Sequence, residues 1–363
     1  MKIVHVISSL SIGGAENFVV QLANEQSKSN DVSIITLGIT DPNKNYIDQI
    51  ENTIHLYQLG WTKKYSIKQF IHLYSFIGKL TPTTIFVHLH NPLYYVYGVS
   101  ILRPKISYIH TIHSSFENWK LILGYLNKLR FINNRILHVC VAPTIYNELQ
   151  KKLPKLKSTV IPNGIKSHYP GREIKEIETF WNNFSISQKK GQRFLAIGNI
   201  NRHKNYKLLS MSFKEVYKIY PKTICVQIGR ETDTILVNEL KKINSPNVFL
   251  AGPQKNAADF LSEADALIVS SVQEGMPIVI LEALSMGVPV ISTPAGGIKD
   301  IIKDGENGFI IDDFEIPSLT AAIVKFIELS QSDKKIMAAN ARSCFEQYYE
   351  IKKVSQSYQS KSA

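Results

Sequence analysis

The chain has 363 residues, of which 44% are apolar, and its 42 basic and 30 acidic residues give a net charge of +12. This length favours two domains over a single core, and the mean hydropathy of -0.07 is ordinary for a globular protein. No run of 18 or more apolar residues occurs, which argues against a transmembrane helix. Three scattered cysteines suit reduced thiols in a cytoplasmic protein and have no metal-binding spacing.

The positive charge is concentrated in the first half of the chain. Residues 1–165 contain 17 basic and 8 acidic residues, a net charge of +9, whereas residues 166–363 contain 25 and 22. Such an excess predicts an acidic partner, either nucleic acid or an anionic membrane surface. Because the chain has no helix-turn-helix, zinc-finger or RNP-like pattern, we favour the membrane surface and expect no nucleic acid.

Strand-like and helix-like runs alternate from the first residues onward. The short apolar run at residues 2–7 is interpreted as a first strand, since no small-residue cleavage site follows it as in a signal peptide. Further strands are predicted at residues 32–37, 84–88, 106–110 and 136–141, and amphipathic helices at 15–27 and 67–79. This alternation predicts a doubly wound parallel sheet, which places residues 1–165 in one α/β domain.

The same alternation starts again after residue 192. Strands are predicted at residues 193–198, 223–228, 248–250, 266–270 and 288–292, and a last helix near 333–349. Residues 193–349 are therefore predicted to form a second doubly wound domain. The polar stretch 166–192 is predicted to be an irregular interdomain connection.

One stretch of the second domain combines a strand end, a turn and a helix start. The turn Glu274-Gly275-Met276 follows a predicted strand, and Pro277 stands at the expected first position of a helix that stops at Gly287. A helix N-terminus favours phosphate, and the carboxylates of Glu274 and Glu282 can accept hydrogen bonds from hydroxyls. A nucleotide sugar carries phosphate between two hydroxyl-bearing ends and would suit this pattern. The alternative is two solvated glutamates beside an ordinary helix.

A series of short motifs surrounds this stretch in a fixed order. The series is Ala264-Asp265, Ser270-Ser271, Glu274-Gly275-Met276-Pro277, Glu282-Ala283, Met286-Gly287-Val288-Pro289-Val290, Gly296-Gly297 and Gly305-Glu306-Asn307-Gly308. It resembles the C-terminal signature of the retaining glycosyltransferases of family four, whose hallmark is an E-x7-E element. The resemblance extends more thinly over almost the whole chain. It implies the GT-B fold, in which two Rossmann-like domains face a central cleft and the C-terminal tail, here residues 350–363, packs back on the first domain.

The resemblance also implies which residues bind the donor. Gly13 and Gly14, in the turn after the first strand, match a glycine pair that faces the donor diphosphate and the acceptor. Lys204 matches a lysine that neutralises the leaving diphosphate. Glu274 would hold the sugar hydroxyls and Glu282 the ribose. The residues that bring the helix N-terminus to the diphosphate would be Gly275, Met276, Pro277 and Ile278.

Two departures from the family pattern fall in the second domain. Asn199 stands where the family has an arginine, and Arg202 is a candidate to supply the missing charge. The turn Gly229-Arg230-Glu231 replaces a glycine-rich turn with an acidic residue. These departures leave the nucleotide base and the details of phosphate binding open.

Four histidines lie at the ends of two predicted strands, namely His88, His90, His110 and His113. Strand carboxyl ends point at the crevice of a doubly wound sheet. No cysteine or carboxylate completes a zinc site, so we expect no metal. His113 best matches the family's cleft histidine, which would contact the donor sugar or the acceptor. The alternative is a hydrogen-bonded structural histidine.

These features predict a cytoplasmic, retaining glycosyltransferase that uses a nucleoside-diphosphate sugar, with UDP implied by the family, and needs no cofactor. The acceptor would be a glycan or a lipid-linked intermediate of a bacterial surface polysaccharide. Two alternatives stay open: a nucleotide-sugar epimerase of GT-B fold, and an inactive GT-B partner subunit.

A basic and aromatic segment in the first domain suggests how the protein would meet a membrane. Residues 119–131 mix aromatic and aliphatic side chains with Lys120, Lys128 and Arg130, as interfacial amphipathic helices do. Lys63 and Lys64 lie near Trp61 and form a second such cluster. The alternative is that the apolar residues pack in the core and the lysines are solvated.

Overall fold

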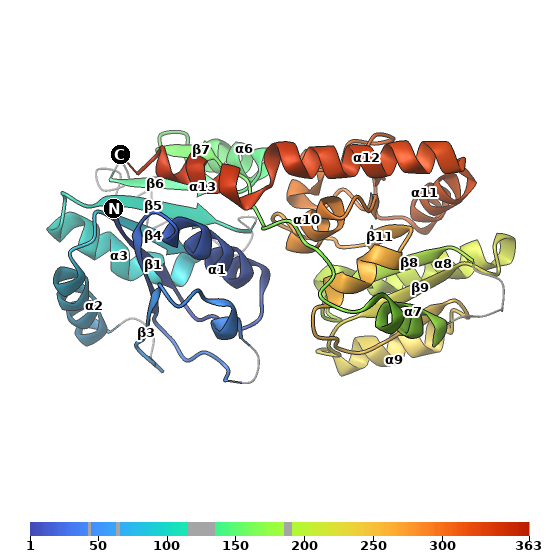
Figure 1. The fold of residues 1–363 in the computed structure, drawn as a ribbon, viewed down its shortest axis with the longest axis horizontal. Coiled ribbons are helices and arrows are strands. Elements are labelled where there is room, and N and C mark those ends of the chain that lie inside the picture. The colour runs from blue at the N-terminus through green and yellow to red at the C-terminus, as the bar shows by residue number, and fades with distance from the viewer. Residues whose placement is uncertain (43–44, 63–65, 115–134, 185–190, 363) are drawn as a thin grey trace. The chain divides into compact units, whose positions relative to one another are not determined.

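The computed structural model describes the whole chain except residues 43–44, 63–65, 115–134, 185–190 and 363. Its internal contacts divide the chain into two compact units. Unit 1 consists of Met1–Lys166 and Tyr349–Ala363, and unit 2 of Ser167–Tyr348. In each unit, helices flank one parallel sheet (Figure 1).

The sheet of unit 1 has seven strands among the described residues, in the order β3-β2-β1-β4-β5-β6-β7. Every neighbouring pair is parallel. The strands are β1 (Lys2–Ile7), β2 (Asp31–Thr36), β3 (His55–Gln58), β4 (Thr84–His88), β5 (Ser107–Ile112), β6 (Ile136–Cys140) and β7 (Ser158–Val160). The strand order reverses between β1 and β4, and in such sheets ligands bind where the order reverses, beyond the carboxyl ends of the strands.

Helices of unit 1 come from both ends of the chain. They are α1 (Gly14–Ser27), η1 (Ile47–Gln49), α2 (Ile67–Leu80), α3 (His90–Leu102), α6 (Pro143–Lys152) and α13 (Ile351–Gln359). Tyr358 of α13 is fully buried, its ring lies 6.0 Å from that of Phe18 in α1, and its hydroxyl is 3.2 Å from Thr111 Oγ1. The C-terminal tail is thus part of the core of unit 1.

The sheet of unit 2 repeats the pattern with six strands in the order β10-β9-β8-β11-β12-β13, again counted among the described residues. The strands are β8 (Arg193–Ile197), β9 (Ile224–Ile228), β10 (Val248–Leu250), β11 (Ala266–Val269), β12 (Val290–Ser292) and β13 (Gly308–Ile310). The order reverses between β8 and β11, so the loops after these two strands flank the expected binding crevice.

The core of unit 2 is aromatic. Phe194 of β8 lies with its ring 5.5 Å from Phe213 and 5.8 Å from Phe326, and all three are buried. The helices described in unit 2 are α7 (Ile174–Asn182), η3 (Arg202–Lys204), α8 (Tyr206–Ile219), α9 (Thr234–Ile243), η4 (Ala257–Glu263), α10 (Ile278–Ser285), η5 (Gly296–Asp300), α11 (Ile316–Glu328) and α12 (Gln331–Tyr348). Burial of such large side chains is the main stabilising contribution to a unit of this size.

The predicted strands and helices that fall in the described ranges are confirmed to within two residues at their ends. The segment 166–192 differs from the prediction, because α7 lies inside the stretch that was expected to be irregular. Ile177 and Trp181 of α7 are buried, and Trp181 Nε1 donates to the carbonyl of Phe260 at 3.2 Å. The ring of Phe180 also stacks on Phe260 with centroids 3.9 Å apart, so the apolar residues of α7 have helical spacing within a polar segment, which the prediction of an irregular stretch missed.

No helix within the described ranges combines the length and the apolar character needed to cross a lipid bilayer. The basic and aromatic segment at residues 119–131 lies outside the described residues, as do Lys63 and Lys64. Trp61 is described, and its ring lies 5.2 Å from Tyr95 of α3.

Candidate functional site

The residues predicted to bind the donor belong to two groups, one at the carboxyl edge of each sheet. Gly13, Gly14 and His113 follow strands β1 and β5 of unit 1. The remainder follow β8 and β11 in unit 2, and they are Asn199, Arg202, Lys204, Glu274, Gly275, Met276, Pro277, Ile278 and Glu282.

An ion pair joins the two loops of unit 2. Lys204 Nζ lies 2.7 Å from Glu274 Oε1, and the same oxygen accepts a hydrogen bond from Ser271 Oγ at 2.7 Å. The two charged side chains are only 23% and 13% exposed, so water screens the pair incompletely. The other carboxylate oxygen of Glu274 has no hydrogen bond to any described residue and can still accept one.

The backbone around Lys204 is fixed by close contacts. Gly198 has φ of +151°, and a Cβ there would come within 3.0 Å of Lys204 Cε and 3.1 Å of the Tyr206 hydroxyl. Asn201 Oδ1 accepts from the Lys204 amide at 3.2 Å, and Ser270 Oγ donates to the Lys204 carbonyl at 2.8 Å. The backbone angle at position 198 thus favours glycine, and the Lys204 side chain lies close over it.

The loop that carries Glu274 is held by a second glycine turn. Gly296 has φ of +52°, and a Cβ at this position would lie 1.9 Å from the Glu274 carbonyl oxygen. The amide of Gly297 donates to the carbonyl of Gly275 at 2.9 Å. The Gly296-Gly297 motif therefore lets one backbone segment approach another and fixes the loop before α10.

Helix α10 begins one residue later than the sequence predicts. Pro277 takes the cap position, with φ of -67° and ψ of 123°, and Ile278 is the first helical residue. The helix ends at Ser285, and Gly287 follows in the left-handed region at φ of +71°. The amide groups of the first turn lie next to Glu274 in the chain, and free amides at a helix N-terminus favour an anion.

Glu282 lies one turn into α10 in a half-buried position. Burial raises the pKa of its carboxyl group, His168 opposes this rise, and the carboxylate of Asp259 adds to it. His168 Nε2 is 2.8 Å from Asp259 Oδ1, and the His168 amide donates to Ser285 Oγ at 3.3 Å. No signal in the sequence pointed to His168 or Asp259, because both lie in segments with no recognisable motif.

The two departures from the family pattern contact each other. Asn199 Oδ1 accepts from the backbone amide of Arg230 and from its Nε, each at 3.3 Å. Among the described side chains, no carboxylate forms an ion pair with Arg230. Arg202 is different: its side chain is 84% exposed, and its Nε lies 3.8 Å from Asp233. Arg230, rather than Arg202, is the arginine held against Asn199.

The glycine turn of unit 1 is covered by an acidic side chain. Gly13 caps α1 in an extended conformation, with φ of -170°. A Cβ at Gly13 would lie 2.2 Å from Glu16 Oε2, so the carboxyl group of Glu16 occupies that space. Burial raises the pKa of Glu16, and a hydrogen bond from its own backbone amide opposes the rise.

His113 follows β5, and its side chain contacts a second histidine, His88. Its Nε2 is 3.4 Å from Nδ1 of His88, and the edge of the Phe18 ring packs on it with centroids 5.5 Å apart. Burial lowers the pKa of His113 to about 3, so the ring is neutral. His110 instead pairs with His138 inside the sheet, Nδ1 to Nδ1 at 3.0 Å. In the ranges that the structure describes, no three His, Cys, Asp or Glu side chains converge as metal ligands would.

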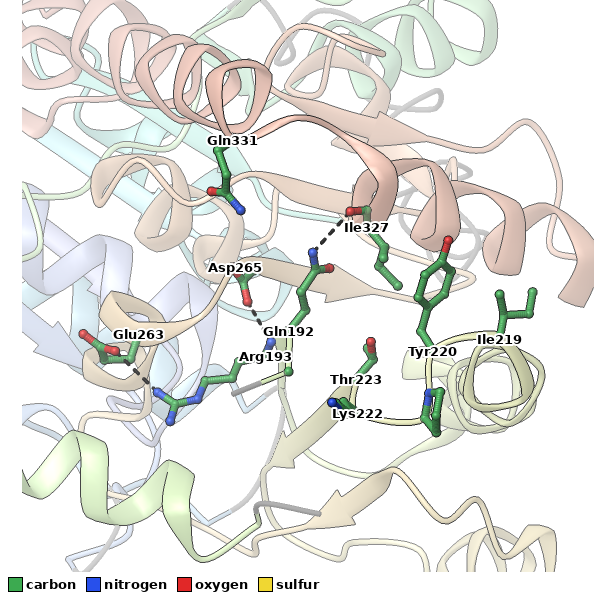
Figure 2. A pocket seen from close by; sticks show the side chains of 12 residues that line it. Gln192, Arg193, Ile219, Tyr220, Lys222, Thr223, Glu263, Asp265, Ile327 and Gln331 are labelled. Atoms are coloured by element: carbon green, nitrogen blue, oxygen red, sulfur yellow. Dashed lines mark hydrogen bonds and ion pairs between the residues drawn. The ribbon is translucent and has the colours of Figure 1, made fainter. Parts of the chain in front are cut away.

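A cavity of about 550 Å³ lies at the opposite edge of unit 2, near the amino ends of β8, β9 and β11. Figure 2 shows Arg193 in an ion pair with Glu263 at 3.4 Å, and its backbone amide donating to Asp265 at 2.7 Å. None of the predicted donor-binding residues lines this cavity. Ligands of doubly wound sheets bind beyond the carboxyl ends of the strands, so a cavity at the amino ends is a poor candidate for the donor site.

Comparisons with known proteins match both units. A family model described as Glycosyltransferase Family 4 matches residues 12–168, and one described as Glycosyl transferases group 1 matches residues 178–343. An uncharacterized glycosyltransferase of Methanocaldococcus jannaschii is 38% identical over 102 residues, which cover 28% of this chain and 25% of that protein. The chain thus spans about a quarter of the length of that relative.

Longer matches extend over most of the chain. The UDP-Gal:alpha-D-GlcNAc-diphosphoundecaprenol alpha-1,3-galactosyltransferase of Escherichia coli is 24% identical over 332 residues, 83% of this chain and 75% of that enzyme. The solved structure of Anabaena HepE in complex with UDP and glucose has a TM-score of 0.80 at 17% identity and covers 99% of this chain and 98% of that one. Each of the two parallel α/β units is matched by a family model, and the fold is shared with HepE. The chain therefore belongs to the family-four glycosyltransferases and has the GT-B fold.

Proposed function

We propose that the enzyme transfers a sugar from a UDP-sugar donor to a hydroxyl acceptor with retention of the anomeric configuration. The observation that carries this proposal is the Lys204–Glu274 pair, which lies between the loops after β8 and β11 and next to the start of α10. This arrangement offers positive charge, a helix terminus and a carboxylate oxygen side by side. The positive charge and the helix terminus suit the phosphates of a sugar diphosphate, and the carboxylate oxygen suits its hydroxyls.

Each group of unit 2 then has one task. Lys204 has three N–H groups, so it can keep its bond to Glu274 and still donate to a phosphate oxygen. The amides at the start of α10 stabilise the charge that grows on the departing diphosphate. Glu274 accepts hydrogen bonds from hydroxyls of the sugar ring through its other oxygen. Glu282 accepts hydrogen bonds from the ribose diol.

The reaction is a substitution at the anomeric carbon. The bond from this carbon to the acceptor oxygen forms as the bond to the diphosphate oxygen breaks, and both partners are on the same face of the sugar. The leaving diphosphate takes the proton of the acceptor hydroxyl, so no protein nucleophile and no metal are needed. Lys204 and the terminus of α10 supply the charge stabilisation that a metal would otherwise provide.

The names of two relatives support the choice of substrates. HepE was solved with UDP and glucose, and the Escherichia coli relative is named for UDP-galactose and a diphosphoundecaprenol acceptor. We therefore propose a UDP-hexose donor and a lipid-linked glycan acceptor for this chain. The acceptor belongs to the pathway of a surface polysaccharide.

A lipid-linked acceptor would require contact with the inner face of the cytoplasmic membrane. The net charge of +9 on residues 1–165 supports this contact, as do the basic residues Lys120, Lys128 and Arg130 in the segment 119–131. Each basic residue near an anionic surface contributes about 1 kcal/mol of binding energy. Vesicle flotation tests the contact: the protein should float with anionic vesicles at low salt, and less so when these three residues are changed to glutamate.

A donor panel tests the proposed function. Wild-type protein is mixed with UDP-, GDP- and dTDP-sugars, and binding is followed by thermal shift and calorimetry, with and without a chelator. UDP-sugars should bind, and one of them should be hydrolysed slowly without acceptor, whatever the chelator. Product from a suitable acceptor should keep the donor's anomeric configuration by NMR. Interconversion of the donor sugars without transfer would indicate an epimerase, and binding without any turnover would indicate an inactive subunit.

A further inference from the structure

The first residues of unit 2 contact helix α10. The amide of His168 donates to Ser285 Oγ at 3.3 Å, and Ser285 Oγ donates to the carbonyl of Glu282 at 2.7 Å. Ser285 is fully buried, so water competes little for these two bonds. His168 is thus tied to the turn of α10 that carries Glu282, the residue proposed to bind the ribose.

The ring of His168 contacts a buried carboxylate. Its Nε2 lies 2.8 Å from Asp259 Oδ1, and Asp259 is only 1% exposed. An ionised carboxylate can only accept, so Nε2 is the donor. The other oxygen, Oδ2, has no hydrogen bond to any described residue. His168 therefore makes the one hydrogen bond of this carboxylate within the described ranges, and burial of a carboxylate without such a partner is costly.

Arg172 lies at the edge of the same cluster but is held by other contacts. Its Nε is 3.8 Å from Asp259 Oδ2 and makes no hydrogen bond to a described residue. Its Nη2 donates to the carbonyl of Lys255 at 2.6 Å, and its Nη1 lies 3.4 Å from Glu176. The guanidinium group also lies over the ring of Phe260, 5.1 Å from its centroid. These contacts fix Arg172 where it attracts the buried carboxylate without bonding to it.

Glu282 has two neighbours that act on its charge in opposite directions. Burial raises the pKa of its carboxyl group, His168 opposes this rise, and Asp259 adds to it. Of the other elements packed on α10, strands β11 and β12 carry no titratable side chain. On α12, Arg342 is paired with Glu346 at 2.6 Å. Among the described side chains, His168 and Asp259 are therefore the groups that set the charge of Glu282.

We propose that His168, held against α10 through Ser285, is a positioning residue that sets, together with Asp259, the charge that Glu282 presents to the ribose. This proposal rests on the proposed function, since Glu282 binds the ribose only there. It assigns His168 no contact with the donor and no part in the bond-breaking step. Its effect on binding passes through Glu282 alone.

Carbon-13 NMR of the full chain, labelled at the glutamate carboxyl carbon, follows the charge of Glu282 without ligand. Its signal is the one that disappears in Glu282→Gln. His168→Gln keeps a donor for Asp259 and removes the ring that can carry charge, so the pKa of Glu282 should rise. Asp259→Asn added to this variant removes a negative charge, so the pKa should fall below that of His168→Gln. The double variant replaces a buried charged pair by neutral groups, a change that folded proteins often tolerate.

A matched control lies on the same element as Asp259. Glu263 is four residues further along η4 and pairs with Arg193 at 3.4 Å. Glu263→Gln removes an acidic group from η4 but not from the neighbours of Glu282. The pKa of Glu282 and the affinity for UDP should both match those of the wild type.

Calorimetry with UDP across a pH series shows whether this charge reaches the ribose site. Wild-type affinity should decline as the pH falls and Glu282 takes up a proton. In His168→Gln the decline should begin at higher pH, and affinity in that range should be up to about tenfold below that of the wild type, the loss when a hydrogen-bonding partner becomes neutral. The double variant should bind UDP more tightly than His168→Gln. Damage to the fold would instead weaken binding in both variants.

The direction of the two pKa changes decides the outcome. An unchanged pKa of Glu282 in His168→Gln overturns the proposal, and so does a double variant whose Glu282 pKa exceeds that of His168→Gln. Circular dichroism checks the fold, and His168→Asn serves if His168→Gln folds poorly. A wild-type protein that binds no UDP overturns the proposed function instead, because the carboxyl titration is measured without ligand.

Discussion

The carboxyl edges of the two sheets are built from different chemistry. The edge of unit 1 includes a glycine turn and the neutral histidine pair of His88 and His113. The edge of unit 2 carries an ion pair between Lys204 and Glu274 and an arginine, Arg230, that has no carboxylate partner among the described residues. The same doubly wound architecture thus presents neutral histidines and one glutamate, Glu16, in unit 1, and an ion pair with a further arginine in unit 2.

This difference follows from which side chains are buried together. A histidine buried beside other histidines has no anion nearby, so desolvation lowers its pKa and it stays neutral. In unit 2 the Lys204 ammonium group instead lies 2.7 Å from the carboxylate of Glu274, so the two side chains form an ion pair. Under the proposed function, the charged edge of unit 2 holds the diphosphate. The following substitutions test the role of this edge, from the largest expected effect to the smallest.

Removal of the negative charge at the unit 2 edge should have the largest effect. Glu274→Gln keeps the shape of the side chain but weakens its bond to Lys204 and its contacts with sugar hydroxyls. We expect transfer to fall by about a hundredfold or more, as for loss of a preorganised polar group at the reacting centre. Steady-state kinetics measure this, and circular dichroism checks the fold. Glu263→Gln, which breaks an ion pair at the opposite edge of the same unit, is the matched control and should stay within twofold of wild type.

Removal of the positive charge of Lys204 should weaken the binding of UDP. Lys204→Met keeps the apolar stem over Gly198 and removes the charge. Affinity for UDP should fall by about tenfold, the range for a hydrogen bond to a charged group, and the affinity of the variant should depend less on salt than that of wild type. Calorimetry across a salt series measures both effects. Lys207→Met removes an exposed lysine from the next helix as a control. Equal salt dependence in wild type and Lys204→Met would show that Lys204 is only a solvated lysine.

Glu282 should show opposite effects on stability and on binding. Its pKa is raised in the folded protein, mainly by burial, so the fold prefers the neutral carboxyl group. Stability is therefore lost as the pH rises from about 4 through the folded pKa. Glu282→Gln removes this loss, and its Tm should exceed that of wild type at pH 7 by about 2–4 °C for each kcal/mol gained. Near pH 4, where both side chains are neutral, the two Tm values should converge.

The same substitution should weaken nucleotide binding. An ionised carboxylate accepts hydrogen bonds from both ribose hydroxyls, whereas an amide offers only one oxygen. We expect about a tenfold loss of UDP affinity at pH 7, within the range for hydrogen bonds to a charged group. Wild-type affinity should also decline as the pH falls and Glu282 becomes protonated. A Glu282→Gln protein with lower Tm and full affinity would mean that the carboxylate is structural.

The features that the sequence predicts well are those with local patterns. The strands and the helices that alternate with them depend on residues close in the chain. The shared fold and the two family matches confirm the GT-B prediction. The start of α10 was predicted one residue early, because proline is compatible with both the cap and the first helical position.

The features that the sequence did not predict depend on side chains from distant segments. His5 and His88 are 83 residues apart, and His168 and Asp259 are 91 apart. Neither pair has a spacing that marks it, so hydrogen-bond partners and raised or lowered pKa values became visible only with the fold. The contact between Asn199 and Arg230 is of the same kind. It joins two positions that, taken singly, looked like unrelated departures from the family pattern.

The contact between Asn199 and Arg230 leads to the prediction with the smallest expected effect on UDP affinity. We propose that Arg230 supplies the positive charge that the family places at position 199, because Asn199 holds its guanidinium group while Arg202 extends into solvent toward Asp233. Arg230→Gln should lower UDP affinity by roughly two- to fivefold, the contribution of a partly screened charge, and Arg202→Gln should leave it unchanged. In Asn199→Ala the guanidinium loses its acceptor, and affinity should fall by a similar factor although no charge is removed. Calorimetry at low salt compares all three. If Arg202→Gln had the larger effect, the charge at this edge would come from the 202 loop, and the Asn199–Arg230 contact would serve only to join the loops after β8 and β9.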